Sequence, residues 1–148
     1  MTHRWNAACV LLLVTGGCGR NSLTTPTEIT GQYVLTGFDG SRNLPCCSQT
    51  DTSGAVVAIA GGVLQIGWNT PGRTYEWDLV RKYDYPDMSS RQVQSRFSSG
   101  TYTWDGQTLK LMDSNGLGPM TGSTNGNIIT VGNQDQQYEF LRLIPLPH

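Results

Sequence analysis

Apolar and polar residues alternate along several short segments of this chain, and a period of two is typical of β-strands with one buried face. The longest alternation covers residues 74–83 (TYEWDLVRKY). One face of this predicted strand carries Tyr75, Trp77, Leu79, Arg81 and Tyr83. Residues 91–97 (RQVQSRF) alternate in the same way and predict another strand.

Turn-forming pairs divide the alternating segments from one another. A β-rich run at 31–38 ends at residues 39–40 (DG), and the pairs at 105–106 (DG) and 125–126 (NG) each lie between two alternating runs. Such pairs tolerate the positive φ angles of a type I′ turn. The sequence therefore predicts hairpins, with a two-residue turn at 105–106.

Two stretches are harder to assign. The apolar runs at 55–60 and 63–68 are separated by Gly61-Gly62. They form either a hairpin with a two-residue turn or one strand that is bent at a bulge. Residues 39–54 contain Ser, Asn, Pro, Gly and Asp without a hydrophobic period, and this predicts one long loop.

Further runs at 120–124, 128–131 and 137–143 complete the pattern. We count about eight or nine strands and find no segment with the period of a helix. A meander of this length either closes into a barrel or leaves open edges, and closure removes those edges. The sequence therefore predicts an all-β fold, an antiparallel up-and-down barrel.

Composition agrees with a turn-rich β-protein. Glycine accounts for 18 of the 148 residues, and charged residues make up 14% of the chain. An average soluble domain has about 25% charged residues, and helical bundles are rich in Ala, Glu, Lys and Leu. The formal net charge of −1 lacks the basic excess of a protein that binds nucleic acid electrostatically, so we expect no nucleic-acid partner.

The N-terminal segment has the features of an export signal. Arg4 precedes an apolar run at 7–14, which is much shorter than the roughly 20 residues that cross a bilayer. Residues 15–17 (TGG) then precede Cys18. This arrangement resembles the lipobox of bacterial lipoproteins, in which the cysteine is acylated and becomes the new amino terminus. The alternative is an ordinary secretory peptide with an incidental cysteine.

The lipobox resemblance implies a domain organisation and a location. Residues 1–17 would be the signal peptide, and Cys18 would carry the lipid that anchors the protein to a membrane. Position 19 is Gly rather than Asp, which by the same resemblance favours the periplasmic face of the outer membrane. Residues 18–29 are polar and contain the lipidated cysteine and a flexible tether, and residues 30–148 form the domain.

Four segments carry a wider resemblance. They are GQYVLTGFDGSRNLP at 31–45, GGVLQIG at 61–67, GTYTWDGQTLKL at 100–111 and QYEFLR at 137–142. Together they resemble small bacterial lipoproteins with a lipocalin-like domain. This resemblance implies an up-and-down β-barrel attached to a membrane by a lipid, and it brings no catalytic residues with it.

Residues for catalysis or metal binding are scarce. His3 lies in the predicted signal peptide and His148 ends the chain, whereas a catalytic or ligating histidine must be held in place. Turn chemistry explains the aspartates Asp84, Asp87, Asp105 and Asp113. Glu76 and Asp78 share a face that we expect to be solvated. We therefore expect no enzyme activity, no cofactor and no metal site.

The adjacent Cys46 and Cys47 are the most unusual pair in the chain. An exported protein meets an oxidising compartment, where the two could form a vicinal disulfide that stiffens the loop. Their Cα atoms are about 3.8 Å apart, below the usual disulfide range, so this bond would be strained and easily reduced. Free thiols and links to another chain are the alternatives.

The barrel interior is the candidate ligand site. Its predicted lining is Tyr33, Leu35, Trp77, Leu79, Arg81, Tyr102, Trp104, Tyr138 and Phe140, with Leu109, Leu111, Ile129 and Val131. Eight-stranded barrels are either filled by side chains or hold one small ligand, and large aromatics favour filling. On this face Arg81 needs a salt bridge, an anionic ligand or a place near the barrel mouth.

Two functional hypotheses follow. The first is a lipid-anchored binding module of the cell envelope, with a small apolar ligand, a lipid or an envelope protein as its partner. The second is a structural or interaction lipoprotein whose barrel is filled and binds no ligand. An enclosed apolar volume or a co-purified small molecule distinguishes the first from the second.

Overall fold

The computed structural model describes residues 29–67, 72–87, 89–115 and 118–143, and these form nine β-strands and no helix. The strands are β1 (Gly31–Phe38), β2 (Cys46–Thr50), β3 (Val56–Ile66), β4 (Thr74–Asp84), β5 (Ser90–Trp104), β6 (Leu109–Asp113), β7 (Pro119–Thr124), β8 (Ile128–Gly132) and β9 (Gln137–Arg142). The all-β prediction is confirmed. The predicted signal peptide, Cys18 and most of the tether lie outside the described residues.

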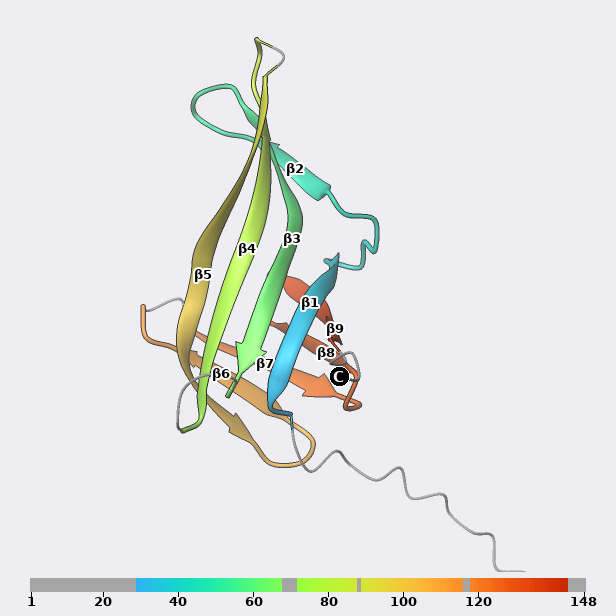
Figure 1. Cartoon of the computed structure of the whole chain (residues 1–148), viewed down its shortest axis with the longest axis vertical. Helices are drawn as coiled ribbons and strands as arrows, with labels where there is room; N and C mark the ends of the chain where they lie inside the picture. Colours follow the sequence, from blue (N-terminus) through green and yellow to red (C-terminus); the bar gives the residue numbers. More distant parts are fainter. Residues whose placement is uncertain (1–28, 68–71, 88, 116–117, 144–148) are drawn as a thin grey trace, which may run out of the picture.

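Eight of the strands close into an antiparallel barrel (Figure 1). From β3 to β9 each strand pairs with the next one in the chain, and β1 completes the ring between β9 and β3. In the closing ladder Gly31 lies opposite Ile66 and Val34 lies opposite Val63. The predicted up-and-down barrel is therefore confirmed.

The ninth strand, β2, lies outside the ring. It pairs with the first part of β3, where Cys46 lies opposite Ile59 and Thr50 opposite Val56. The prediction of one loop over 39–54 is therefore wrong at 46–50. The first part of β3 extends beyond β1, so β1 leaves this edge available for β2, and such an edge can pair with a segment that has no hydrophobic period of its own.

The two apolar runs around Gly61-Gly62 form one continuous strand, β3, with a bulge between Ile59 and Gly61. Of the two alternatives, the bent strand is correct and the hairpin is wrong. Gly62 allows a close approach to β4, because a Cβ atom there would lie 2.7 Å from the carbonyl oxygen of Asp78. The bend separates the part of β3 that pairs with β1 from the part that pairs with β2.

The turn between β5 and β6 is wider than predicted. Trp104 pairs with Leu109, so residues 105–108 form the loop instead of a two-residue turn. The Asp105 carboxylate accepts hydrogen bonds from the backbone N–H groups of Gln107 (2.9 Å) and Thr108 (2.7 Å). These bonds stabilise the longer loop, because aspartate readily bonds the backbone two residues onward.

The barrel has two regions of different construction. We call β2, with residues 56–59 of β3, 81–84 of β4 and 90–93 of β5, the extended wall, because these paired segments rise beyond the short strands β6 to β9 (Figure 1). The rest of the ring is the closed half. Its fully buried core side chains are Tyr33, Leu64, Ile66, Trp77, Leu109, Leu111, Ile129, Val131 and Phe140.

Candidate functional site

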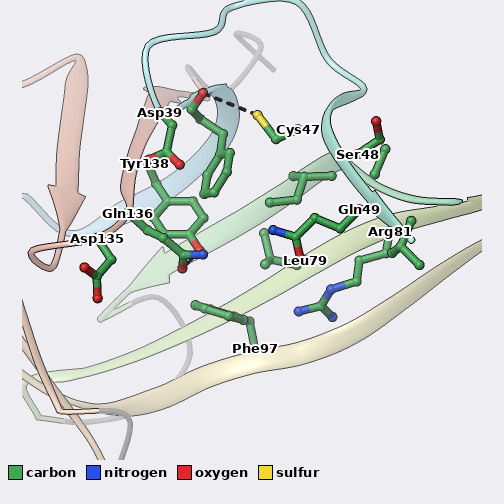
Figure 2. Close-up of a pocket in the computed structure, with 14 residues that line it drawn as sticks. Asp39, Cys47, Ser48, Gln49, Leu79, Arg81, Phe97, Asp135, Gln136 and Tyr138 are labelled. Atoms are coloured by element: carbon green, nitrogen blue, oxygen red, sulfur yellow. Dashed lines mark hydrogen bonds between the residues drawn. The ribbon is translucent and has the colours of Figure 1, made fainter. Parts of the chain in front are cut away.

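A cavity of about 540 Å³ lies at the barrel mouth, between the extended wall and the end of the closed half (Figure 2). Segments far apart in the sequence surround it: the end of β1, strand β2, the first part of β3, the middle of β4 and β5, and the start of β9 with the turn before it. Its lining residues are Phe38, Asp39, Cys47, Ser48, Gln49, Val57, Ala58, Ile59, Leu79, Arg81, Phe97, Asp135, Gln136 and Tyr138.

Aromatic side chains form the floor of this cavity. The ring of Trp77, which is fully buried, lies 4.8 Å from the ring of Phe97 and 4.6 Å from that of Tyr138, measured between centroids. Phe140 follows at 5.1 Å from Trp77. Because aromatic rings at these distances are in contact, this cluster forms the part of the packed core that lies next to the cavity.

Arg81 is the cationic side chain of the cavity. Its Nη1 donates a hydrogen bond to Ser95 Oγ at 3.0 Å, and its guanidinium carbon lies 6.0 Å from the centroid of the Phe97 ring. Within the described part of the chain no carboxylate lies within 4.0 Å of this guanidinium. The sequence predicted a salt bridge, an anionic ligand or a place near the barrel mouth for Arg81. The structure places Arg81 near the mouth, and within the described residues it has no salt bridge.

Two carboxylates, Asp39 and Asp135, line the side of the cavity away from Arg81 in Figure 2. Asp39 follows β1 and accepts a hydrogen bond from the backbone N–H of Gln137 at 2.7 Å. Asp135 lies in the turn between β8 and β9. The cavity therefore has one positively charged side and one negatively charged side.

Tyr138 contributes a neutral hydroxyl to the cavity. The hydroxyl donates a hydrogen bond to Gln136 Oε1 at 2.9 Å. Burial raises the pKa of Tyr138 to about 12, with a further increase from the negative charge of Asp39 and an opposing effect from Arg81. The phenol is therefore protonated at neutral pH, so it can donate a hydrogen bond but carries no charge.

The cysteine pair lies at the edge of the same cavity, and Cys47 is one of its lining residues. Both are free thiols with their Sγ atoms 2.7 Å apart, and Cys47 has a positive φ of 60°. Local desolvation and the neighbouring Cys46 raise the pKa of the Cys47 thiol to about 11. Cys47 is therefore protonated at neutral pH and a weak nucleophile.

The predicted interior residues occupy three environments. Most are buried in the core, namely Tyr33, Leu35, Trp77, Leu79, Tyr138 and Phe140, with Leu109, Leu111, Ile129 and Val131. Tyr102 and Trp104 are partly buried and pack against this core without lining the cavity. Arg81, Leu79 and Tyr138 are the predicted residues that reach the cavity.

Sequence reasoning missed the contribution of β2 and the turns. Ser48 and Gln49 come from a segment predicted as loop, and Asp39 and Asp135 are turn residues that carry no period. Phe97 could have been found, because it shares the face of residues 91–97 that carries Val93 and Ser95. No local signal identifies Gln49, because its position depends on pairing with Val57.

The acidic residues outside the cavity have structural partners. Arg96 bridges Glu76 (2.8 Å) and Asp78 (2.8 Å) across the outer face of β4 and β5. Asp87 accepts hydrogen bonds from Ser89, as expected for turn chemistry. Among the residues that the structure covers, no group of three or more His, Cys, Asp or Glu side chains could hold a metal ion.

Comparison of the chain with protein families, with curated proteins and with solved structures finds no match. Residues 29–67, 72–87, 89–115 and 118–143 include no helix long and apolar enough to cross a membrane. The evidence for a function therefore comes from the cavity and from the N-terminal sequence.

Proposed function

We propose that this chain is a lipid-anchored binding module of the cell envelope that holds one small, largely apolar ligand in its barrel mouth. The observation that carries the proposal is the cavity of about 540 Å³ above a packed core. Ligand sites commonly have volumes of about 300–1,000 Å³ and combine apolar walls with a few polar groups. Phe38, Ile59, Leu79 and Phe97 supply apolar surface here.

The construction of the mouth supports binding. Val57 and Ile59 of β3 line the cavity, and both side chains remain partly exposed. Figure 2 shows that the side chain of Gln49 points into the cavity from β2. A ligand in the cavity would cover apolar surface that is now in contact with water, and this burial stabilises a complex by about 25 cal/mol per Å².

The anchoring part of the proposal is supported by sequence. The short apolar run, the small residues at 15–17 and Cys18 resemble a lipobox, and Gly19 favours the periplasmic face of the outer membrane. In cell fractionation, we expect the wild-type chain in the membrane fraction and the Cys18→Ser variant in the soluble periplasmic fraction. A Cys18→Ser variant that stays with the membrane would contradict lipid anchoring.

Native mass spectrometry tests the binding part. The full chain is extracted from expressing cells in a mild detergent and compared with its Gln49→Trp variant, in which a larger side chain occupies the cavity. We expect a small-molecule adduct on the wild type and none on Gln49→Trp. Lys110→Gln on the outward face of β6 is the matched control and should retain the adduct.

The second hypothesis is a structural or interaction lipoprotein without a ligand. The closed half favours it, because the inward side chains there form a buried hydrophobic cluster. A wild-type protein that carries no adduct, and that binds no apolar probe in solution, would support this alternative and contradict the binding proposal.

A further inference from the structure

We infer that the ligand carries a single negative charge and that Arg81 binds this anionic group. The inference rests on the proposed binding function and adds the chemical class of the ligand, a small amphipathic monoanion such as a carboxylate or sulfonate. It depends on the unpaired guanidinium at the cavity, on the apolar surface beside it and on the carboxylates at the opposite side.

Arg81 has unused hydrogen-bonding capacity. A guanidinium has five N–H donors in a planar fork. The structure gives one of them to Ser95 Oγ at 3.0 Å, and Ser95 is neutral. A partly buried cation without a counter-ion is unfavourable, so an anion that enters the cavity gains a charge-assisted hydrogen bond, and the remaining donors of the planar fork allow a bidentate one.

On the outer face of the same strands, Lys82 and Arg96 have carboxylate partners, unlike Arg81. Lys82 pairs with Asp84 at 3.0 Å, and Arg96 pairs with Glu76 and Asp78. The carboxylates of β4 thus pair with cations of the outer face, and within the described residues none pairs with the inward Arg81. Arg81 is partly buried and lines the cavity, so an anion that enters the cavity can serve as its counter-ion.

Apolar side chains lie next to Arg81, and they indicate that the part of the ligand beside its anionic group is apolar. Ile59 lies opposite Arg81 in the β3–β4 ladder, Leu79 precedes it on the same face, and Phe97 lies beneath it. All three line the cavity. A ligand whose anionic group reaches Arg81 therefore places its apolar body on these side chains.

The carboxylates restrict the charge of the ligand. Asp39 and Asp135 line the other side of the cavity, where they repel a second negative group. This repulsion orients the ligand with its anionic end toward Arg81. A dianion would gain less than a monoanion, because one of its charges would face Asp39 or Asp135.

Two fluorescent probes that share one ring system test the inference. Anilinonaphthalene sulfonate is a monoanion, and N-phenylnaphthylamine lacks the sulfonate. Each is titrated into the full chain carrying Cys18→Ser, so that no acyl chain competes for the probe. We expect both to bind, and we expect Arg81→Met to weaken the sulfonate about tenfold while the affinity for the neutral probe is retained. Arg81→Lys keeps the charge and should recover most of the loss.

The controls separate this inference from the proposed function. Lys110→Gln removes a positive charge on the outward face of β6 and should change neither affinity. Binding of both probes that is insensitive to Arg81→Met, in a variant with unchanged thermal unfolding, overturns the anionic ligand and leaves the binding module intact. Failure of both probes to bind the Cys18→Ser chain, or equal binding to its Gln49→Trp variant, overturns the binding module itself.

Discussion

The closed half and the extended wall are built from the same long strands, yet their inward faces differ. On β4, Tyr75, Trp77 and Leu79 are buried, whereas Arg81 and Tyr83 on the same face are partly exposed. The change occurs where the ring of strands ends and only β2, β3, β4 and β5 continue. A period of two therefore identifies an inward face, and ring closure decides whether that face is core or binding surface.

Truncation of Trp77 gives the largest expected difference between the two regions. Trp77→Ala removes a fully buried ring that contacts Phe97, Tyr138 and Phe140, and should lower the free energy of unfolding by ~3–5 kcal/mol. Tyr83→Ala on the same face of the wall is the control and should cost about 1 kcal/mol. Urea denaturation measures both, and equal losses would mean that the wall is packed like the core.

Tyr138 connects the two regions and should make stability depend on alkaline pH. Its pKa in the folded protein is about 12, above the ordinary value of 10.0, so the unfolded chain loses this proton first. The stabilising effect of the protonated phenol is complete below pH 10, and stability falls by at most about 2–3 kcal/mol as pH rises to 12, because solvent screening reduces the effect. Denaturation curves at several pH values should show this slope in the wild type and a reduced slope in Tyr138→Phe.

The bend in β3 marks the boundary between the regions, and its two glycines should respond differently. Gly62→Ala places a Cβ atom 2.7 Å from the Asp78 carbonyl oxygen and should cost ~1–3 kcal/mol. At Gly61 a Cβ atom meets no atom within 4 Å, so Gly61→Ala should be close to neutral. Thermal unfolding compares the pair, and a tolerated Gly62→Ala would show that β3 and β4 are not held in close contact here.

The outer face should contribute little in either region. Arg96 is exposed and forms ion pairs with Glu76 and Asp78, so Arg96→Gln should lower stability by less than ~1 kcal/mol. High salt should reduce the difference between variant and wild type, because it screens exposed charges. A larger effect that persists in salt would mean that the outer face holds the wall in place.

Oxidation of the cysteine pair should have the smallest effect on stability, since a bond between adjacent residues closes almost no loop. The two thiols are free in the structure, and in an oxidising compartment a vicinal disulfide, free thiols and a link to another chain are the three alternatives. Mass spectrometry of the exported chain after alkylation without reductant distinguishes them. Alkylation of both thiols would exclude the bond.

Local sequence patterns predicted the strands that have a clear alternation of apolar and polar residues and turn residues at their ends. β1 and β4 match the predicted runs closely, because turn residues and strict alternation bound them. β2 was missed because its structure comes from an edge of β3 that local sequence does not reveal. Alternation predicted that Arg81 lies on the inner face. Whether that position belongs to the core or to the cavity depends on which strands continue past the ring, and this is not visible in the local sequence.

An amide NMR titration of the Cys18→Ser chain with anilinonaphthalene sulfonate tests the division between packed half and binding mouth most directly. The largest shifts should occur at Gln49, Arg81 and Phe97, with Leu109, Leu111 and Ile129 of the closed half nearly unchanged. Shifts that are largest in the closed half, or absent from the mouth, would contradict the account.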